Sequence, residues 1–501
     1  MIAEKDLMKL ANGSDVRGVA VEGVADEPVN LTPEAANRIT SAFVHFLTDK
    51  TGKKDHGLRV AVGHDCRISS PALKDAALEA LTAAGVVTVD CGLASTPAMF
   101  MTTVFKETEM DGAIMITASH LPYNRNGLKF FTTDGGIESA DVKKLLEDAG
   151  RIPEMQGDRR KVQSYNLMER YGHYLRKKIR KALCVEDDPL KGLHIVVDAG
   201  NGNGGFFVTQ VLGRLGADTS GSVYLDPDGH FPNHIPNPEN KQAMASIREA
   251  VLKSHADLGL IFDTDVDRMG AVLANGKEIC RNELIALMAA ILAPQYPGST
   301  IVTDSVTSDE LTDFLENELG LKHHRYMRGY RNVIDECQRL NEAGTVSPLA
   351  IETSGHGAIA DNYYLDDGAY LAVLLIIAAA QARRKGKKLS SLIKDLGAPL
   401  ETREVRMSIR GVEDAHAYAE QVIQTVEKRA REQGIKLAEP NYEGIRFVFP
   451  HGWALLRASL HDAEMPLNIE SRKKGGVAEI AATIKGLLGG FDALGTTALD
   501  K

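Results

Sequence analysis

Residues 59–65 read Arg-Val-Ala-Val-Gly-His-Asp, a short run with β-branched residues that ends in an aspartate. Two later stretches have the same form: His-Ile-Val-Val-Asp at residues 194–198 and Thr-Ile-Val-Thr-Asp at residues 300–304. Short runs of this kind, separated by longer helical stretches, predict α/β domains with mixed, largely parallel sheets. Their recurrence favours three similar copies of one α/β design, although unrelated α/β domains can share so short a pattern by coincidence.

Each of these runs is followed by a second apolar run that breaks into a polar loop: Gly112–Ile116 before Ser119, Leu258–Phe262 before Asp263, and Pro348–Ile351 before Glu352. Open α/β sheets bind their ligands at the carboxyl ends of the strands. We therefore expect each copy to deliver one functional loop at that edge of its sheet.

The chain of 501 residues is too long for a single hydrophobic core, so several domains are expected. We place them at residues 1–185, 186–298, 299–400 and 401–501. After residue 400 come a strand-like run, a long charged helix, further strands and a closing helix near residues 477–488. That order predicts a smaller C-terminal α+β domain with antiparallel strand pairing.

The composition is that of a globular protein, with 44% hydrophobic and 25% charged residues. A net charge of −10 gives no general attraction to nucleic acid or to acidic membranes, so we expect neither as a partner. The five cysteines are scattered without a Cys-x-x-Cys pair, which predicts reduced thiols and a cytoplasmic location. The most apolar run, Leu371 to Ala380, is about half of the roughly 20 residues that a membrane helix needs, so a buried helix is expected there.

The segment 117–129 (Thr-Ala-Ser-His-Leu-Pro-Tyr-Asn-Arg-Asn-Gly-Leu-Lys) is rich in turn-forming residues. The hydroxyl of Ser119 could act there as a nucleophile, with His120 and Lys129 stabilising negative charge beside it. The alternative is an ordinary turn in which serine and asparagine side chains cap backbone groups.

Three carboxylates alternate in residues 263–268 (Asp-Thr-Asp-Val-Asp-Arg), directly after an apolar run. In an extended loop Asp263, Asp265 and Asp267 would point the same way and could converge on one cation. Oxygen ligands without cysteine or nearby histidine favour Mg²⁺ over Zn²⁺. The spacing does not fit an EF-hand, and a haloacid-dehalogenase-type phosphatase would want threonine or valine at Asp267. A solvated acidic turn is the plain alternative.

Two further loops carry side chains suited to sugars and phosphates. Glu352, Ser354 and His356 alternate along one loop, where a carboxylate and a hydroxyl suit paired sugar hydroxyls and a histidine suits hydroxyl or phosphate. The same residues would also serve as an N-cap and turn before a helix. Arg457 and Ser459 could hold a phosphate, unless this segment is an exposed strand end.

In chain order these loops resemble the motifs of the α-D-phosphohexomutase family. Thr-Ala-Ser-His followed by Asn-x-Asn-Gly-x-Lys resembles the family's serine loop, although Leu121 stands in place of the usual asparagine. The aspartate loop resembles the family's Asp-Gly-Asp-x-Asp-Arg metal loop, with Thr264 in place of glycine. The next loop resembles its Gly-Glu-x-Ser-Gly-His sugar loop, with Ile351 in place of the leading glycine.

The resemblance implies a role for the residues of the first loop. Ser119 would be the phosphoserine that exchanges its phosphoryl group with the sugar, and Lys129 would be an acid/base or charge-stabilising group. His120 is a further candidate catalytic residue. Residues 13–18 (Gly-Ser-Asp-Val-Arg-Gly) resemble an amino-terminal motif of the family, which makes Arg17 a further candidate catalytic residue.

For the other loops the resemblance implies ligands. The phosphate on Ser119 and the carboxylates of Asp263, Asp265 and Asp267 would hold Mg²⁺, with Arg268 beside the same site. The substrate would be bound by the sugar loop, whose Glu352 and Ser354 would grip the sugar's 3- and 4-hydroxyls next to His356.

The fourth loop matches less well. Arg457 and Ser459 agree with the family's phosphate loop, but Leu460 and His461 depart from it. Residues 63–70 resemble a further family motif, which we interpret as mainly structural. Contacts near Arg328 cannot be carried over, because the family has other residues there.

The family's activity implies a magnesium-dependent isomerase that moves phosphate reversibly between C1 and C6 of a hexose through phosphoserine and a hexose 1,6-bisphosphate. The sugar loop resembles that of the mannose/glucose mutases, and phosphoglucosamine mutases share it. A phosphatase, or a degenerate protein that binds sugar phosphates without turnover, are the alternatives from other classes. We expect a monomer or a homodimer.

Overall fold

The computed structural model describes residues 3–459 and 462–500. The chain divides into two compact units. The larger unit comprises residues 1–280, 354–358 and 365–391, and the smaller unit comprises residues 281–353, 359–364 and 392–501.

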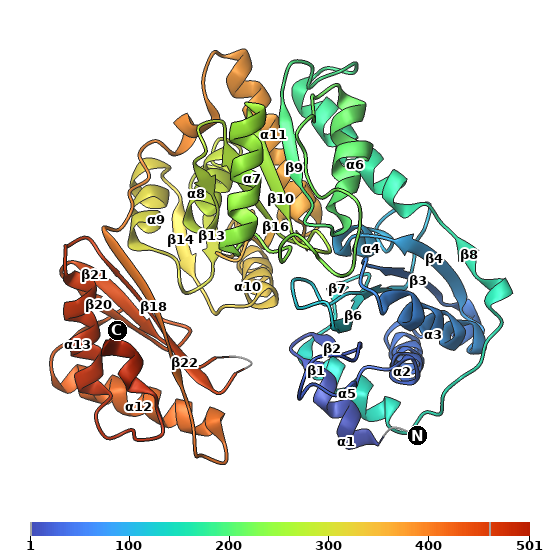
Figure 1. Ribbon diagram of the computed structural model, residues 1–501, viewed down its shortest axis with the longest axis horizontal. Coiled ribbons are helices and arrows are strands. Elements are labelled where there is room, and N and C mark those ends of the chain that lie inside the picture. The colour runs from blue at the N-terminus through green and yellow to red at the C-terminus, as the bar shows by residue number, and fades with distance from the viewer. Residues whose placement is uncertain (1–2, 460–461, 501) are drawn as a thin grey trace. The chain divides into compact units, whose positions relative to one another are not determined.

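The first sheet of the larger unit contains eight strands in the order β1-β2-β6-β5-β3-β4-β8, with β7 paired to β6 (Figure 1). Their bounds are β1 Ala11–Asn12, β2 Asp15–Val19, β3 Arg59–His64, β4 Val87–Leu93, β5 Gly112–Ile116, β6 Arg125–Thr132, β7 Gly135–Gly136 and β8 Gln163–Ser164. β3, β4, β5 and β8 run parallel, whereas β6 is antiparallel to β5. The sheet is therefore mixed, as predicted.

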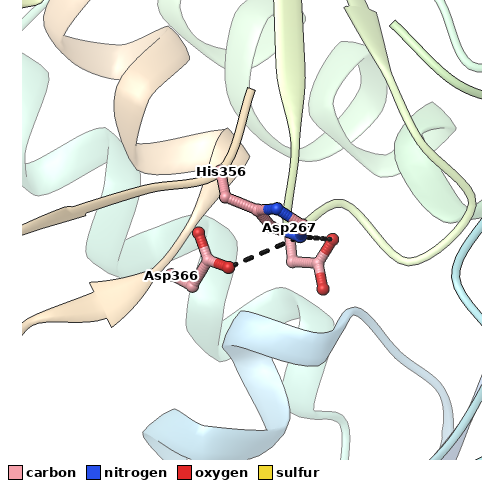
Figure 2. A group of neighbouring side chains, drawn as sticks. All are labelled: Asp267, His356 and Asp366. Atoms are coloured by element: carbon pink, nitrogen blue, oxygen red, sulfur yellow. Dashed lines mark ion pairs between the residues drawn. The ribbon is translucent and has the colours of Figure 1, made fainter. Parts of the chain in front are cut away.

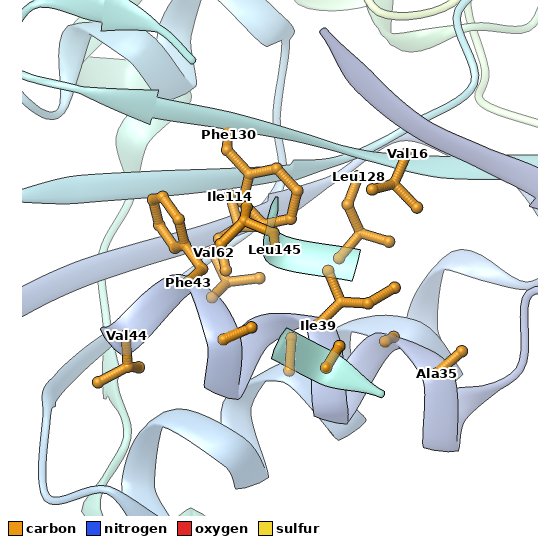
Figure 3. Close-up of a cluster of buried hydrophobic side chains, with 14 of the residues drawn as sticks. Val16, Ala35, Ile39, Phe43, Val44, Val62, Ile114, Leu128, Phe130 and Leu145 are labelled. Carbon is orange, nitrogen blue, oxygen red and sulfur yellow. The ribbon is translucent and has the colours of Figure 1, made fainter. Parts of the chain in front are cut away.

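Helix α2 (Pro33–Thr51) provides much of the core of this domain and packs against α3 (Ser70–Ala83) and α5 (Ser139–Ala149). Its start is capped by the Thr32 hydroxyl, which accepts a hydrogen bond from the Ala35 N–H. Figure 3 shows Ile39 and Phe43 of α2 facing side chains of the sheet, among them Phe130. The Phe43 and Phe130 rings lie 4.8 Å apart, and burying such a side chain stabilises the fold by roughly 2–3 kcal/mol.

The second sheet has the order β12-β11-β10-β9. Its strands are β9 Ile195–Asp198, β10 Leu258–Phe262, β11 Met269–Leu273 and β12 Glu278–Ile279, and α7 (Lys241–Ser254) packs on β9 and β10. Two further helices of the larger unit, α6 (Leu167–Leu183) and α11 (Gly368–Arg384), contact one another.

The predicted apolar helix lies within α11, where Leu371, Val373 and Ile376 are fully buried. The buried helix is therefore confirmed. Among the residues that the structure describes, none forms a helix long and apolar enough to span a membrane.

In the smaller unit, β13 (Thr300–Thr303) runs parallel to β14 (Lys322–Arg325) and to β15 (Leu349–Ile351). Helix α10 (Tyr330–Glu342) packs on β13 and β15, and α8 (Arg281–Leu292) and α9 (Asp309–Asp313) belong to the same domain. The short strand β17 (Leu365–Asp366) belongs to the larger unit, as do residues 357 and 358 of β16 (Gly357–Ile359).

The threefold pattern of the sequence is confirmed in the strand pairing. β3 pairs in parallel with β5, β9 with β10, and β13 with β15. In each case the first predicted strand lies beside the second. Because neighbouring parallel strands end at the same edge of a sheet, the loop after each second strand emerges beside the aspartate that ends the first run.

The C-terminal domain has one antiparallel sheet in the order β18-β22-β21-β20-β19, as predicted. Its elements are β18 Glu401–Ser408, α12 Ala415–Glu432, β19 Lys436–Leu437, β20 Ile445–Phe449, β21 Gly452–Leu456, β22 Glu464–Ser471 and α13 Gly476–Leu487. Apolar side chains of α12 and α13 form a common core with the strands. β21 ends at Leu456, directly before Arg457.

Candidate active site

Ser119 lies two residues beyond the predicted start of the polar loop after β5 and is 3% exposed. Its backbone has φ = +52°, a left-handed conformation that residues other than glycine rarely adopt. The Ser119 N–H donates to the Thr117 hydroxyl over 3.0 Å, which helps to hold this turn. Such strain persists only where the surrounding structure fixes it, and it is often found at functional sites.

The turn is held by a buried pair, Asp65 and Arg67, which sequence analysis treated as mainly structural. Asp65 accepts hydrogen bonds from the Thr117 hydroxyl at 2.8 Å and from Arg67 Nε at 3.0 Å. The Arg67 guanidinium donates to the backbone carbonyls of Ser119, Leu121 (2.7 Å), Pro122 (2.7 Å) and Arg125 (3.0 Å). This pair therefore positions the whole serine loop.

The carboxylates of Asp263, Asp265 and Asp267 come together, with ligand atoms within 4.8 Å of one another. The expected extended loop is wrong, because residues 264–267 form a tight turn and Val266 has φ = +66°. For a β-branched residue this backbone conformation is strained. The three carboxylates converge because the chain turns, not because alternate residues of an extended strand share a face.

The serine loop and the aspartate loop meet at the Ser119 hydroxyl. It donates to Asp263 Oδ2 at 3.0 Å and accepts from Arg268 Nη2 at 2.8 Å. The same Arg268 nitrogen donates to His120 Nδ1. The charge of Arg268, and then burial, hold the pKa of His120 well below its usual range, so the ring is neutral and can accept that bond.

The predicted cations of the site are also brought together. Lys129 Nζ lies 3.1 Å from Asp267 Oδ2 and 3.7 Å from Asp15 Oδ2. Arg17 contacts the same Asp15 oxygen at 2.8 Å. Asp15, which sequence analysis did not single out, therefore links Arg17 to Lys129, and it could have been noticed only as the acidic member of the 13–18 motif.

The electrostatics of the aspartate loop fit a cation. Burial, followed by repulsion from the neighbouring carboxylates, raises the pKa of Asp263 and of Asp265. Burial also opposes ionisation of Asp267, but Lys129, His356 and Arg268 outweigh it and hold the pKa of Asp267 well below its usual range.

Two carboxylate oxygens of this loop lack a hydrogen-bond donor among the described residues. They are Oδ1 of Asp265 and Oδ1 of Asp267, both on side chains with at most 1% exposure. Buried carboxylate oxygens without a donor are costly unless a cation satisfies them. A purely oxygen donor set of this kind suits Mg²⁺.

The predicted sugar loop is divided between the two units. In the larger unit the Ser354 hydroxyl and His356 Nδ1 lie 3.0 Å apart, and His356 Nε2 lies 3.6 Å from Asp267 Oδ1 (Figure 2). In the smaller unit Glu352 is 3% exposed and its Oε1 accepts the Gly329 N–H at 2.7 Å.

Asp304, which sequence analysis used only as a strand end, anchors the residue beside Glu352. Its Oδ2 accepts from the hydroxyl of Thr353 at 2.6 Å and from the N–H of the same residue at 3.3 Å. Burial, and the nearby charge of Glu352, raise the pKa of Asp304 to about 6.

Arg457 directly follows β21 in the smaller unit and is 5% exposed. Its Nη1 lies 3.9 Å from Oε1 of Glu443, while the other oxygen of that carboxylate accepts from the Arg328 N–H at 3.2 Å and from the Ser305 hydroxyl. Burial lowers the pKa of Arg457 although Glu443 opposes this. Ser459 lies two residues further on, and Leu460 and His461 lie outside the described residues.

Comparison with known proteins gives matches along most of the chain. Three family models match: phosphoglucomutase/phosphomannomutase alpha/beta/alpha domain I at residues 8–152, domain II at residues 169–276, and domain III at residues 281–399. These three domains of one architecture define a sugar-phosphate mutase fold.

Individual relatives agree. A phosphomannomutase/phosphoglucomutase of Pseudomonas syringae is 27% identical over 481 residues, covering 95% of this chain and 94% of the relative. A phosphoglucosamine mutase of Sphingopyxis alaskensis is 30% identical over 399 residues, covering 76% and 85%. The crystal structure of a phosphoglucomutase/phosphomannomutase family protein from Burkholderia thailandensis superposes with a TM-score of 0.79 at 25% identity, covering 99% and 100%.

The chain belongs to the α-D-phosphohexomutase superfamily, as its sequence motifs suggested, and its activity is that of a phosphohexomutase. The names of its relatives divide between mannose or glucose phosphates and glucosamine phosphate.

Proposed function

We propose that this protein moves a phosphoryl group reversibly between C1 and C6 of mannose or glucose phosphate. Ser119 would carry the phosphoryl group, and a hexose 1,6-bisphosphate would be the intermediate and activator. The observation that supports this proposal most is the environment of the Ser119 hydroxyl, which lies between the carboxylate of Asp263 and the guanidinium of Arg268. A serine in an ordinary capped turn would need neither.

The residues around Ser119 suit both directions of transfer. When phosphoserine gives its phosphoryl group to a sugar hydroxyl, the bond between phosphorus and Ser119 Oγ breaks and a bond to the sugar oxygen forms. The hydroxyl proton must leave and the serine oxygen must be stabilised. Arg268 donates a hydrogen bond to that oxygen, and Lys129, held beside Asp267, is the candidate to exchange the proton or balance the charge.

Asp263, Asp265 and Asp267 would hold Mg²⁺ in this site. A bound Mg²⁺ neutralises negative charge on the transferring phosphoryl oxygens. Without a metal, the three clustered and buried carboxylates would repel a phosphate. The positive charges of Arg17, Lys129 and Arg268 offset only part of this repulsion.

The sequence motifs support the remaining proposed substrate contacts. Glu352 and Ser354 would bind sugar hydroxyls. Arg457 and Ser459 would hold the phosphate that is not reacting. His356 would contact either the sugar or its phosphate.

The Ser119→Ala variant tests the proposal. We expect it to lose at least about 10³-fold in bisphosphate-dependent mutase rate, as removal of a covalent nucleophile does in other enzymes. The exposed Ser164→Ala variant is the matched control and should keep the wild-type rate. Substantial turnover by Ser119→Ala would exclude the phosphoserine mechanism. Steady release of inorganic phosphate without a bisphosphate requirement would favour a phosphatase, and binding without turnover would favour a degenerate protein.

Phosphoglucosamine mutase is the second candidate, because the relative of that name is 30% identical. A coupled assay with glucose 1-, mannose 1- and glucosamine 1-phosphate, each with Mg²⁺ and bisphosphate activator, separates the two. The highest kcat/KM on glucosamine 1-phosphate would contradict our preference for mannose and glucose.

A further inference from the structure

A second group of metal-ligating side chains lies beside the three aspartates. Asp267, His356 and Asp366 offer one ligand atom each, and these atoms lie within 4.8 Å of one another. His356 Nε2 is 3.6 Å from Asp267 Oδ1 and 3.6 Å from Asp366 Oδ2. Figure 2 shows the three side chains turned toward one another. All three belong to the larger unit.

The groups behind these ligands hold them in a suitable orientation. The Gly357 N–H donates to Asp366 Oδ1 at 2.8 Å, which leaves Oδ2 directed toward the histidine. His356 Nδ1 lies 3.0 Å from the Ser354 hydroxyl. If Nε2 binds a metal, Nδ1 carries the proton and donates to that hydroxyl, which is the usual arrangement behind a metal-bound histidine.

The Asp267 oxygen that faces this group also points to a cation. Asp267 is 1% exposed, and its Oδ1, the oxygen nearest to His356, has no hydrogen-bond donor among the described residues. Two positively charged side chains lie near this carboxylate. Arg268 Nε is 3.8 Å from Oδ1, and Lys129 Nζ contacts the other oxygen. A buried carboxylate oxygen without a donor, aimed at an imidazole and a second carboxylate, fits a divalent metal.

We propose that Asp267, His356 and Asp366 form a second cation site that selects metals of the Zn²⁺ and Co²⁺ type. One imidazole and two carboxylates make a borderline donor set, whereas the three aspartates suit Mg²⁺. Asp267 belongs to both groups and would bridge them. Three protein ligands leave at least one coordination position of a tetrahedral metal open.

The second site has a consequence for substrate binding that rests on the proposed function. Ser354 and His356 are the proposed contacts of the sugar phosphate. If Zn²⁺ binds His356, neither His356 nor the Ser354 hydroxyl that is hydrogen-bonded to it would be available to bind the substrate. Zn²⁺ should therefore inhibit in competition with the phosphosugar, and added Mg²⁺ should not relieve the inhibition fully.

Metal binding to the full chain tests the site without any assay of activity. With Mg²⁺ at saturation, we expect calorimetric titration to show one further equivalent of Zn²⁺, and Co²⁺ to give visible absorption bands typical of a nitrogen-containing site. If the wild-type protein binds no Zn²⁺ or Co²⁺ under these conditions, the proposal is overturned whatever the variants do.

Variants locate the binding. Asp366→Asn and His356→Gln should each lose the Zn²⁺ equivalent while retaining Mg²⁺ binding, which also shows that they fold. Asp263→Asn should weaken Mg²⁺ binding and keep the Zn²⁺ equivalent, and the exposed Asp492→Asn is the control. Unchanged Zn²⁺ stoichiometry in both Asp366→Asn and His356→Gln would contradict the assignment. If the wild-type protein binds Zn²⁺ as expected but has no mutase activity, the result would count against the proposed function and not against the second cation site.

Discussion

The Arg67→Lys substitution gives the sharpest prediction, because Arg67 joins the Ser119 turn to the sheet. The guanidinium makes hydrogen bonds to four backbone carbonyls of residues 119–125 and to Asp65, and the side chain is 1% exposed. Lysine keeps the charge opposite Asp65 but offers three donors on one nitrogen instead of a planar fork.

The magnitude follows from the hydrogen bonds that lysine cannot make. At least two buried carbonyls of the loop lose their donor, and each unsatisfied group costs about 1–3 kcal/mol. We expect Arg67→Lys to lower the free energy of unfolding by about 2–6 kcal/mol. Arg67→Ala, which also leaves Asp65 buried without its partner, should cost at least about 3–5 kcal/mol.

The catalytic effect should exceed what stability alone explains. Relaxation of the loop moves Ser119, and a misplacement of about 1 Å can cost on the order of 10²-fold in rate. We would measure urea unfolding, phosphorylation of Ser119 by mass spectrometry and the mutase rate at a temperature where the variant is folded. The control is Arg160→Lys, since Arg160 is exposed and its side chain bonds only to Asp158 among the described residues. A folded Arg67→Lys protein with the wild-type phosphorylation rate would refute the positioning role.

Asp263→Asn should reduce Mg²⁺ affinity at least about 10-fold in calorimetric titration, because one of three charged ligands is removed; unchanged affinity would exclude this carboxylate as a ligand. Burial, and then the charge of Glu310, raise the pKa of Glu470 from 4.5 to about 7. Folded-state stability from this group is therefore complete below pH 4.5 and is lost as the pH rises through about 7, by at most about 3 kcal/mol. Glu470→Gln should narrow the difference between melting temperatures at pH 5 and pH 8, and an unchanged difference would assign the pH dependence to other groups. Glu443→Gln should lower KM for the phosphosugar several-fold, because the Glu443 carboxylate lies at 3.9 Å from Arg457 and competes with a phosphate for it; a raised KM would show that this carboxylate supports binding.

Structural features that depend on residues close together in the chain could be predicted from the sequence. The strands that end at or one residue before Asp65, Asp198 and Asp304 could be predicted, because β-branched runs between helices are a local pattern. The convergence of the three metal-loop carboxylates could also be predicted, but not its cause. The left-handed backbone of Val266 has no local sequence signal, since a β-branched residue disfavours it.

Partners distant in the chain could not be predicted in this way. The contact of Arg67 with the carbonyls of the Ser119 loop joins segments more than 50 residues apart. Glu443 accepts the Arg328 N–H across a separation of 115 residues. Which buried carbonyl accepts from which guanidinium depends on the tertiary fold. The domain boundaries and the roles of individual site residues stay predictions.

In two of the three repeats, the aspartate that follows the first strand also holds the loop of the neighbouring strand. In the first repeat Asp65 accepts the hydroxyl of Thr117, two residues before Ser119. In the third repeat Asp304 accepts the hydroxyl of Thr353, one residue after Glu352. Both carboxylates are fully buried and each fixes a threonine of the loop that leaves the neighbouring parallel strand.

The second repeat uses its aspartate differently. Asp198 is bonded to His234 at 3.0 Å and to the Ser246 hydroxyl at 2.6 Å, while the metal loop is held by the Asn203 N–H, which donates to the Thr264 carbonyl at 2.8 Å. A carboxylate bonded to the metal loop would add negative charge next to three others, at a cost that a backbone amide avoids. In the second repeat the charge of Asp198 is therefore stabilised by His234 and Ser246, and a neutral backbone hydrogen bond holds the loop beside the cation site.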